Sequence, residues 1–326
     1  LKFPTIKKRV WPKQKCAIEI DDQQGCPRYI GTVIKNVSVK KATDKIIKNL
    51  RVLGMRSVNN IVDITNFCLM ETGQPLHAFD YDKLAGGKII VRWARKGETI
   101  VTIDNVEREL DPSILVIADE RRPVAIAGIM GGKATEVTSG TKNIFLESAY
   151  FDSTLIRRSS RKLGLSSDSS YRFERGVDFE MVEVGANRAV DLILEGKMAR
   201  VVQRQDSVFR KKKILSRQIV LSLSWINTYI GASLTIAQCK NVITKLGFNF
   251  TAAKTGVFRI TPPSFRNDIH EAVDIVEEIS RIIGYDQLPI SFPRVMLSQT
   301  LSDPKREARN HVRDFFLAQG FNEIIT

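Results

Sequence analysis

The pattern of apolar and polar positions divides the chain into segments typical of amphipathic helices and short strands. Apolar residues recur at helical spacing after Thr43, which predicts a helix capped by Thr43 and ended by Gly54. Similar patterns predict further helices at 58–70, 151–163, 179–195, 235–246, 269–283 and 304–319. Alternating or β-branched runs predict strands at 16–20, 29–34, 89–93, 114–117, 123–127, 144–146, 218–222, 248–251, 257–261 and 321–326.

These blocks predict an α+β, multidomain protein. Residues 1–43 form a basic, strand-rich segment, and 44–206 form a mixed α/β domain with helices on either side of a block of strands. Residues 207–288 combine short helices with a hairpin in a small winged-helix-like α+β domain. Residues 289–326 contain a linker and the start of a further domain.

Composition narrows the class of protein. With 326 residues, 43% of them apolar, the chain has enough material for two or three cores. Its apolar runs are far shorter than the roughly 20 residues that cross a bilayer, so we expect a soluble protein without a membrane partner. Four cysteines without a C-x-x-C pair, and only three histidines, favour a reducing cytoplasm over a disulfide framework or a zinc site. The N-terminus lacks both a signal-peptide pattern and a methionine, which suggests a fragment or a processed product.

The net charge of +14 is unevenly distributed. Residues 1–60 hold 14 Lys and Arg against 4 Asp and Glu, and 200–217 hold seven basic residues against a single acidic one. This asymmetry favours a polyanionic partner, either nucleic acid or an acidic subunit. A surface that is merely solubilising would also account for it.

The segment 161–176 is rich in hydroxyl groups between basic residues. Four serines, an aspartate and a tyrosine lie between Arg161 and Arg175. Consecutive hydroxyls disfavour a helix and offer donors and acceptors, and the guanidinium groups favour an anionic ligand such as phosphate. A solvated loop would have the same composition.

A second candidate site is acidic. The residues are Asp268, Asp274, Glu277 and Glu278. The last three occupy positions i, i+3 and i+4 of one expected helix, so their carboxylates share a face and could hold Mg²⁺ with the first. The same groups could instead cap the helix together with Glu271 or pair with Arg281.

Seven short blocks occur in a fixed order, at 56–66, 73–80, 127–132, 147–149, 171–178, 262–268 and 274–278. In this order they resemble the β subunit of bacterial-type phenylalanyl-tRNA synthetase. The resemblance implies that 1–43 is the remnant of an N-terminal domain, that 44–206 is a tRNA-binding editing domain, and that 289–326 opens a truncated catalytic-like domain. The acidic cluster would be a magnesium site near the α-subunit contact.

The resemblance also implies a function. An α subunit would attach phenylalanine to tRNA(Phe) with ATP, and the β subunit would support it in a cytoplasmic α2β2 heterotetramer. The editing domain would hydrolyse mischarged Tyr-tRNA(Phe). Such a second site has a physical reason, because an apolar pocket rejects one added hydroxyl by only about a hundredfold.

The site residues are carried over from the family motifs by resemblance. Glu147 would accept the tyrosine hydroxyl, and His77, Asn66 and Thr65 would lie near the ester and the terminal adenosine. The pocket would be completed by Ala127, Gly128, Ser167 and Ser169, with serines where other members have threonine and alanine. Water is expected to attack the ester directly.

Each of these residues also has a plain structural interpretation. Glu147 could be an ordinary glutamate at a strand end, His77 a packed core residue, and Gly131 and Gly132 a turn. The alternative function is a non-catalytic tRNA- or nucleic-acid-binding module, or a scaffold whose editing has decayed.

Overall fold

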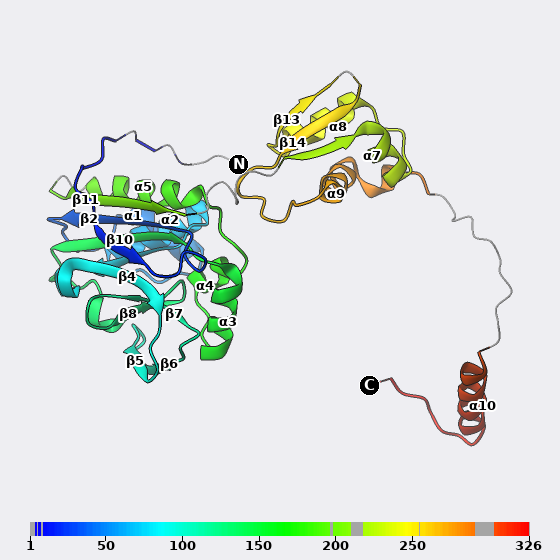
Figure 1. The fold of residues 1–326 in the computed structure, drawn as a ribbon, viewed down its shortest axis with the longest axis horizontal. Coiled ribbons are helices and arrows are strands. Elements are labelled where there is room, and N and C mark those ends of the chain that lie inside the picture. The colour runs from blue at the N-terminus through cyan, green and yellow to red at the C-terminus, as the bar shows by residue number, and fades with distance from the viewer. Residues whose placement is uncertain are drawn as a thin grey trace.

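The computed structural model describes residues 4, 6, 7, 9–195, 198–209, 218–253, 255–290 and 303–325. It is α+β, as the sequence predicts, with several separate sheets and hydrophobic cores. Figure 1 shows a larger unit, a smaller unit and a helix near the C-terminus. Among the described residues, no helix is both long enough and apolar enough to cross a bilayer.

A four-stranded antiparallel sheet forms the centre of the larger unit. Its strands, in spatial order, are β11 (Arg200–Val208), β2 (Arg28–Lys35), β10 (Asn143–Tyr150) and β3 (Leu76–Asp80). One face is covered by α1 (Asp44–Val52), α2 (Asn60–Thr72) and α5 (Met181–Leu194), as Figure 1 shows. Ile34, Ile144 and Leu146 of the sheet pack there against these helices.

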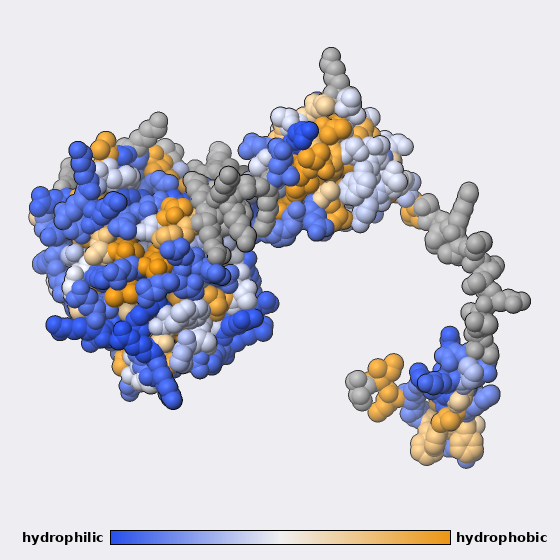
Figure 2. Space-filling model, in the orientation of Figure 1, coloured by the Kyte–Doolittle hydropathy of each residue, from blue (hydrophilic) through white to orange (hydrophobic). Residues whose placement is uncertain are grey.

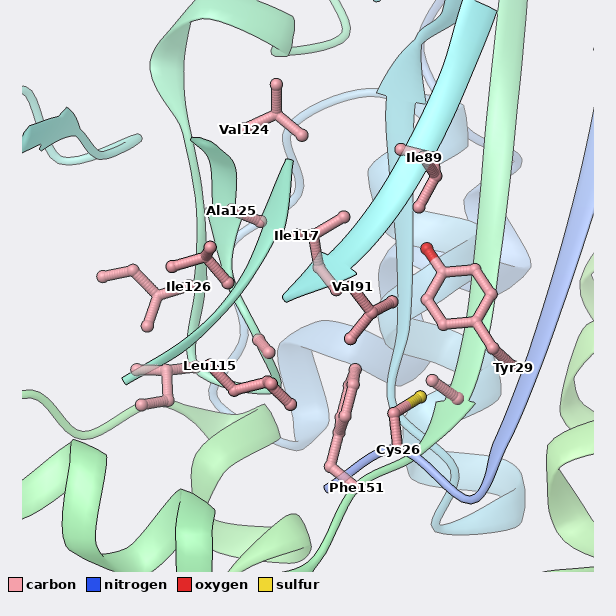
Figure 3. Close-up of a cluster of buried hydrophobic side chains, with 14 of the residues drawn as sticks. Cys26, Tyr29, Ile89, Val91, Leu115, Ile117, Val124, Ala125, Ile126 and Phe151 are labelled. Atoms are coloured by element: carbon pink, nitrogen blue, oxygen red, sulfur yellow. The ribbon is translucent and has the colours of Figure 1, made fainter. Parts of the chain in front are cut away.

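A five-stranded sheet packs against the other face. Its strands, in spatial order, are β1 (Ala17–Ile20), β4 (Lys88–Trp93), β7 (Leu115–Ala118), β8 (Pro123–Ile126) and β9 (Met130–Gly131). Tyr29 of β2 lies among Val91 and Ile117 in the core between the two sheets (Figure 3). A hairpin of β5 (Glu98–Val101) and β6 (Glu107–Leu110) extends from this unit, which also includes α3 (Ser153–Leu163) and α4 (Asp168–Phe173).

Short 3-10 turns complete the larger unit at η1 (Tyr81–Lys83), η2 (Ala85–Gly87) and η3 (Lys133–Thr135).

The smaller unit has a three-stranded sheet in the order β12 (Ile219–Ser222), β14 (Val257–Thr261) and β13 (Asn249–Ala252). Its helices are α7 (Leu223–Ile230), α8 (Ile236–Lys245), α9 (Ala272–Ile283) and the 3-10 turn η4 (Tyr285–Gln287). Its core is its own, centred on Ile226, Phe258 and Ile279.

Hydrogen bonds between described residues join the two units. The Ser264 hydroxyl donates to Asp178 Oδ2 (3.0 Å), and Asn267 Nδ2 donates to the Val177 carbonyl (3.2 Å).

The helix α10 (Pro304–Ala318) follows Asp303, whose side chain caps it by accepting from the Lys305 amide. No residue of α10 is buried, and its apolar side chains, such as Phe315, lie open to solvent (Figure 2).

The predicted helices are present, with ends shifted by a few residues. α2 shows why, because Asn59 accepts hydrogen bonds from the Ile61 and Val62 amides at its start, and Gly73 ends it with φ of 74°. The strands β3, β5, β6, β9 and β11 and the helix α7 were not predicted, and β3 and β11 show the reason. Both lack the strong alternation of apolar and polar residues that identifies a strand in a sequence. β3 is extended because it pairs with β10, and β11 is extended because it pairs with β2.

Two other expectations were wrong. The hydroxyl-rich segment contains the helix α4, because Ser167 accepts from the Ser170 amide while the Ser170 hydroxyl accepts from the Ser167 amide, a capping box made by two serines. The expected strand at 321–326 is also not formed over 321–325. A strand needs a partner strand for its hydrogen bonds, and no strand in the described part of the chain pairs with this segment.

Candidate active site

Glu147 and His77, seventy positions apart in the sequence, lie directly opposite each other on β10 and β3. Gly31 of β2 is the partner of Glu147 on its other side. Side chains on one face of a sheet alternate along each strand, so Glu147 and His77 share the face that turns toward the five-stranded sheet. The register of three strands therefore creates this pair.

Glu147 is buried and bound to a tyrosine of the chain itself. The Tyr29 hydroxyl donates a hydrogen bond to Glu147 Oε2 at 2.6 Å. Burial raises the pKa of Glu147 to about 7, against the lowering effect of the bond from Tyr29. The carboxyl group therefore changes between its neutral and charged forms near neutral pH.

His77 is half-buried and uncharged at neutral pH. Its ring meets the Phe79 ring edge-on, with the centroids 4.5 Å apart. Burial lowers the pKa of His77 to about 4. The neutral imidazole can accordingly donate a hydrogen bond from one ring nitrogen and accept one at the other.

Gly131 of β9 lies against the imidazole, which corrects its interpretation as a turn residue. A Cβ added at Gly131 would lie only 2.7 Å from His77 Nε2. Gly131 pairs with Ala125 in the five-stranded sheet, so it is a strand residue that makes room for a ring. Sequence reasoning missed this role because the closeness of β9 to β3 depends on how the two sheets pack.

The segment 127–131 also connects the pair to α4. The Ser167 hydroxyl donates to the Ile129 carbonyl at 2.7 Å, so the N-terminus of α4 is fixed to this segment. Gly128 has φ of 67°, and an added Cβ would come within 3.1 Å of Ile156, Phe173 and Phe151. The structure thus gives Gly128 a packing reason, and Ala127 is buried beside it.

Thr65 and Asn66 lie on α2. The buried Thr65 hydroxyl donates to the Val62 carbonyl of its own helix at 2.7 Å. Asn66 is half-buried one turn before Met70, whose Sδ is 3.2 Å from Arg172 Nη2 of α4. The Asn66 face of α2 therefore turns toward α4, although no hydrogen bond within the described residues joins Thr65 or Asn66 to His77 or Glu147.

Ser169 occupies the second position of α4 and is half-buried. Four predicted residues or segments are therefore connected through the structure: Glu147, His77, 127–131 and Ser167. Tyr29 is the residue that sequence reasoning missed. Strand alternation places it on β2, but the sequence alone does not reveal which carboxyl group it meets.

In the structure, acidic residues of the smaller unit bind arginine side chains and backbone amides. Arg266 binds both Asp268 (2.6 Å) and Glu278 (3.0 Å), and Arg281 binds the other Glu278 oxygen (2.6 Å). Asp274 accepts from the amides of His270 and Glu271 and so caps α9. Within the described ranges, no three His, Cys, Asp or Glu side chains are placed to hold a metal ion.

The positive charge of Arg266 competes with the expected Mg²⁺ for two of these carboxylates. The guanidinium of Arg266 lies between two of the four carboxylates, and it lowers the pKa of both Asp268 and Glu278. A cation would have to displace this positive charge before oxygen ligands could surround it. The structure contains the capping and pairing contacts, and the magnesium site stays a prediction.

We therefore expect the smaller unit to be stable without Mg²⁺. Adding Mg²⁺ or EDTA should leave the thermal unfolding midpoint unchanged in calorimetry. Arg266→Gln should lower the free energy of unfolding by about 1–3 kcal/mol, because the largely buried Glu278 carboxylate loses a charged donor. A rise in the midpoint with Mg²⁺ that is lost in Glu278→Gln would contradict this view.

A cavity of about 310 Å³ lies away from Glu147 and His77. It is bordered by α1, the N-terminal turn of α2, and the C-terminal end of α5. Its lining includes the exposed Lys40 and Lys41 and the apolar Ile46 and Ile193. The candidate site described above is thus defined by the facing titratable side chains of Glu147 and His77 rather than by this cavity.

Known proteins match both units. Residues 25–197 match the B3/4 domain family, and residues 219–285 match the tRNA synthetase B5 domain family. A Phenylalanine--tRNA ligase beta subunit from Moorella thermoacetica is 43% identical over 310 residues, which are 95% of this chain and 38% of that protein. The protein of the same name from Geobacter metallireducens is 38% identical over 324 residues, which are 99% of this chain and 40% of that protein.

Among solved structures, an N-terminal fragment of the phenylalanyl-tRNA synthetase beta subunit from Pyrococcus horikoshii is similar, with a TM-score of 0.41 and 15% identity over 87% of this chain and 78% of that one. The chain spans about two fifths of the length of the curated relatives it matches. Because the B3/4 model covers more than half of the 326 residues, the chain belongs to the B3/4 domain family, and it is similar to phenylalanine–tRNA ligase beta subunits over nearly its whole length.

Proposed function

We propose that this chain acts as part of a phenylalanine–tRNA ligase β subunit, and that its larger unit hydrolyses tyrosine mischarged on tRNA(Phe). An α subunit would carry out the ATP-dependent attachment of phenylalanine, with any magnesium it needs, in an α2β2 assembly in the cytoplasm. The relatives' names support the ligase role. The facing pair of Glu147 and His77 is the observation that carries the hydrolytic role.

Glu147 would recognise the hydroxyl that distinguishes tyrosine from phenylalanine. In its charged form the carboxylate accepts a hydrogen bond from a phenol, and phenylalanine has no group to offer. A charged acceptor in a buried place makes a stronger bond than one in water, since the low dielectric screens it less. The buried side chain of Glu147 therefore suits selection for tyrosine.

His77 would act at the ester. A neutral imidazole can orient a water molecule or a ribose hydroxyl by hydrogen bonding. No serine hydroxyl or thiol in the described residues forms a hydrogen bond with His77, so we assign the attack on the ester carbonyl to water. The ester bond to the ribose breaks, and free tyrosine and tRNA leave.

Basic side chains beside this site suit the tRNA backbone. α3 carries Arg157, Arg158 and Arg161 on its exposed surface, and the following turn leads to Ser167. Guanidinium groups bind phosphate oxygens through parallel hydrogen bonds. They lie on the helix just before Ser167, which would bring the end of a bound tRNA toward Glu147 and His77.

The test compares the hydrolysis of Tyr-tRNA(Phe) and Phe-tRNA(Phe) by the purified chain. We expect faster release of tyrosine, and Glu147→Ala should reduce the preference for the tyrosyl ester by about 10- to 100-fold, the usual effect of losing a hydrogen bond to a charged group. Glu109→Ala, an exposed glutamate on β6, is the matched control and should keep the preference. Equal rates for both esters in the wild type, unaffected by either change, would refute the hydrolytic role.

A binding module without editing is the second candidate. It is favoured by the hydrogen bond from Tyr29, which already occupies one oxygen of Glu147. Retained tRNA binding together with no hydrolysis of either ester would select this alternative.

A further inference from the structure

We propose that Tyr29 is the positioning residue for Glu147, holding Oε2 by its own phenol so that Oε1 is left to accept the hydroxyl of the substrate. The inference rests on the proposed editing function and names a specificity-determining residue for it. Four observations support it: the contact, the burial, the neighbouring glycine and the neutral surroundings.

The contact is diagonal across two strands. Tyr29 of β2 lies opposite Ala149 of β10, and Glu147 is two residues away on the same face of β10. Aromatic side chains reach such diagonal neighbours across an antiparallel pair. The phenol oxygen and Glu147 Oε2 are 2.6 Å apart, the short distance expected when a hydroxyl donates to a carboxyl oxygen.

The burial makes this arrangement fixed. Tyr29 is completely buried, with its ring in the core between the two sheets (Figure 3). A substrate phenol therefore cannot displace the Tyr29 side chain into solvent. Substrate must use the other carboxyl oxygen, and Glu147 retains 7% exposure through which it can be reached.

Gly31 keeps the two groups close. It lies directly opposite Glu147, between Glu147 and β11, where an added Cβ would overlap the Phe145 ring and come within 2.7 Å of Ile18. A side chain at this position would displace Phe145 from the core. The glycine thus leaves no side chain directly opposite Glu147 on β2, and Tyr29 reaches Glu147 from the next position along this face.

The other titratable groups facing the pair are uncharged at neutral pH. Burial raises the pKa of Cys16 to about 11 and that of Cys26 well above its ordinary value, and it lowers the pKa of His77 to about 4. No arginine or lysine of the described residues forms an ion pair with Glu147. The phenol of Tyr29 is then the group that stabilises the charged carboxylate.

The orientation has a chemical consequence. Because Oε2 accepts the hydrogen of Tyr29, a proton taken up by Glu147 binds Oε1, the oxygen that faces the substrate. Protonation turns this oxygen from an acceptor into a donor and removes the charge-assisted bond to a phenol hydroxyl. Tyr29 thus links the protonation of Glu147 to the selection of tyrosine.

The test is Tyr29→Phe, which keeps the ring and removes one oxygen. With ¹³C-labelled glutamate, the titration midpoint of Glu147 (assigned through Glu147→Gln) should rise by about one pH unit, because the charged form loses a donor. The preference for Tyr-tRNA(Phe) over Phe-tRNA(Phe) at neutral pH should fall by about 3- to 10-fold. Tyr81→Phe, which removes a hydroxyl from a tyrosine packed on the same core, is the matched control.

A role in packing alone would leave both the midpoint and the preference unchanged, and that result would overturn the proposal. An unchanged preference despite a shifted midpoint would overturn it as well. If Tyr29→Phe does not fold, 3-fluorotyrosine at position 29 keeps the hydroxyl and makes it a stronger donor, so the midpoint should fall. A wild-type chain that hydrolyses neither ester defeats the proposed function, whereas the titration separately reports whether Tyr29 holds the carboxyl.

Discussion

Glu147→Gln and His77→Gln are expected to change the pH dependence of unfolding in opposite directions. The pKa of Glu147 rises from 4.5 to about 7 on folding, so the folded state favours its protonated form. This contribution is fully present below pH 4.5 and is lost as the pH rises through 7. At 1.36 kcal/mol for each pKa unit, it amounts to about 3 kcal/mol.

His77 has the opposite sign. Its pKa falls from 6.5 to about 4 on folding, so the folded state favours the neutral ring. The contribution is present above pH 6.5, and it is lost as the pH falls through 4. It amounts to at most about 3 kcal/mol, since some solvent reaches the half-buried ring. In the wild type the two contributions largely cancel over their common range.

Urea unfolding at several pH values separates them. In Glu147→Gln, the free energy of unfolding should increase with pH between about 4 and 6.5, because only His77 remains. In His77→Gln it should decrease between about 4.5 and 7. Glu109→Gln, on the surface, should follow the wild type. Parallel curves for all four proteins would show that the two buried groups keep their ordinary pKa values.

Arg28→Ala should lower the free energy of unfolding of the larger unit by about 3 kcal/mol. Arg28 is 2% exposed, and it donates to the Phe179 carbonyl (2.9 Å), Asp206 (2.8 Å) and Glu183 (3.3 Å). Removing one partner of a buried ion pair costs about 3–5 kcal/mol, and the partial exposure of Asp206 and Glu183 places the effect at the lower end.

Arg188→Ala is the matched control for this prediction. Arg188 makes two hydrogen bonds with Glu71 (2.6 and 3.0 Å), but both side chains are about a quarter exposed. Its loss should cost less than about 1 kcal/mol. Chemical denaturation of both variants checks the difference. Equal losses would mean that the burial of Arg28 contributes nothing beyond the pair itself.

The sequence predicted the elements whose signals are local. The end of α2 at Gly73 and the end of α3 at Gly164 follow from glycines in the left-handed region, and such residues are visible in a sequence. β2 was visible because its alternation and β-branched residues are strong. β3 was not visible, because a run of five residues with mixed polarity occurs equally in loops and in strands at the edge of a sheet.

Side-chain chemistry was harder to predict than the fold. The acidic residues around α9 have the spacing of a metal site, yet Arg266, two positions before Asp268, binds both Asp268 and Glu278. The run of serines at 166–170 disfavours a helix in the sequence, but Ser167 and Ser170 cap each other at the start of α4. In each case the residue types allowed two arrangements, and the partner that decided between them became evident only in three dimensions.

The sequence by itself determined the α+β class and most of the helices, and its resemblance to the family supplied the site residues as predictions. Tertiary structure alone decided that Glu147 faces His77, that Tyr29 occupies one oxygen of Glu147, and that Gly131 lies against the imidazole. The physical reason is that helix ends and alternation depend on neighbours within a few positions. Strand register and sheet packing instead depend on the burial of side chains from distant parts of the chain.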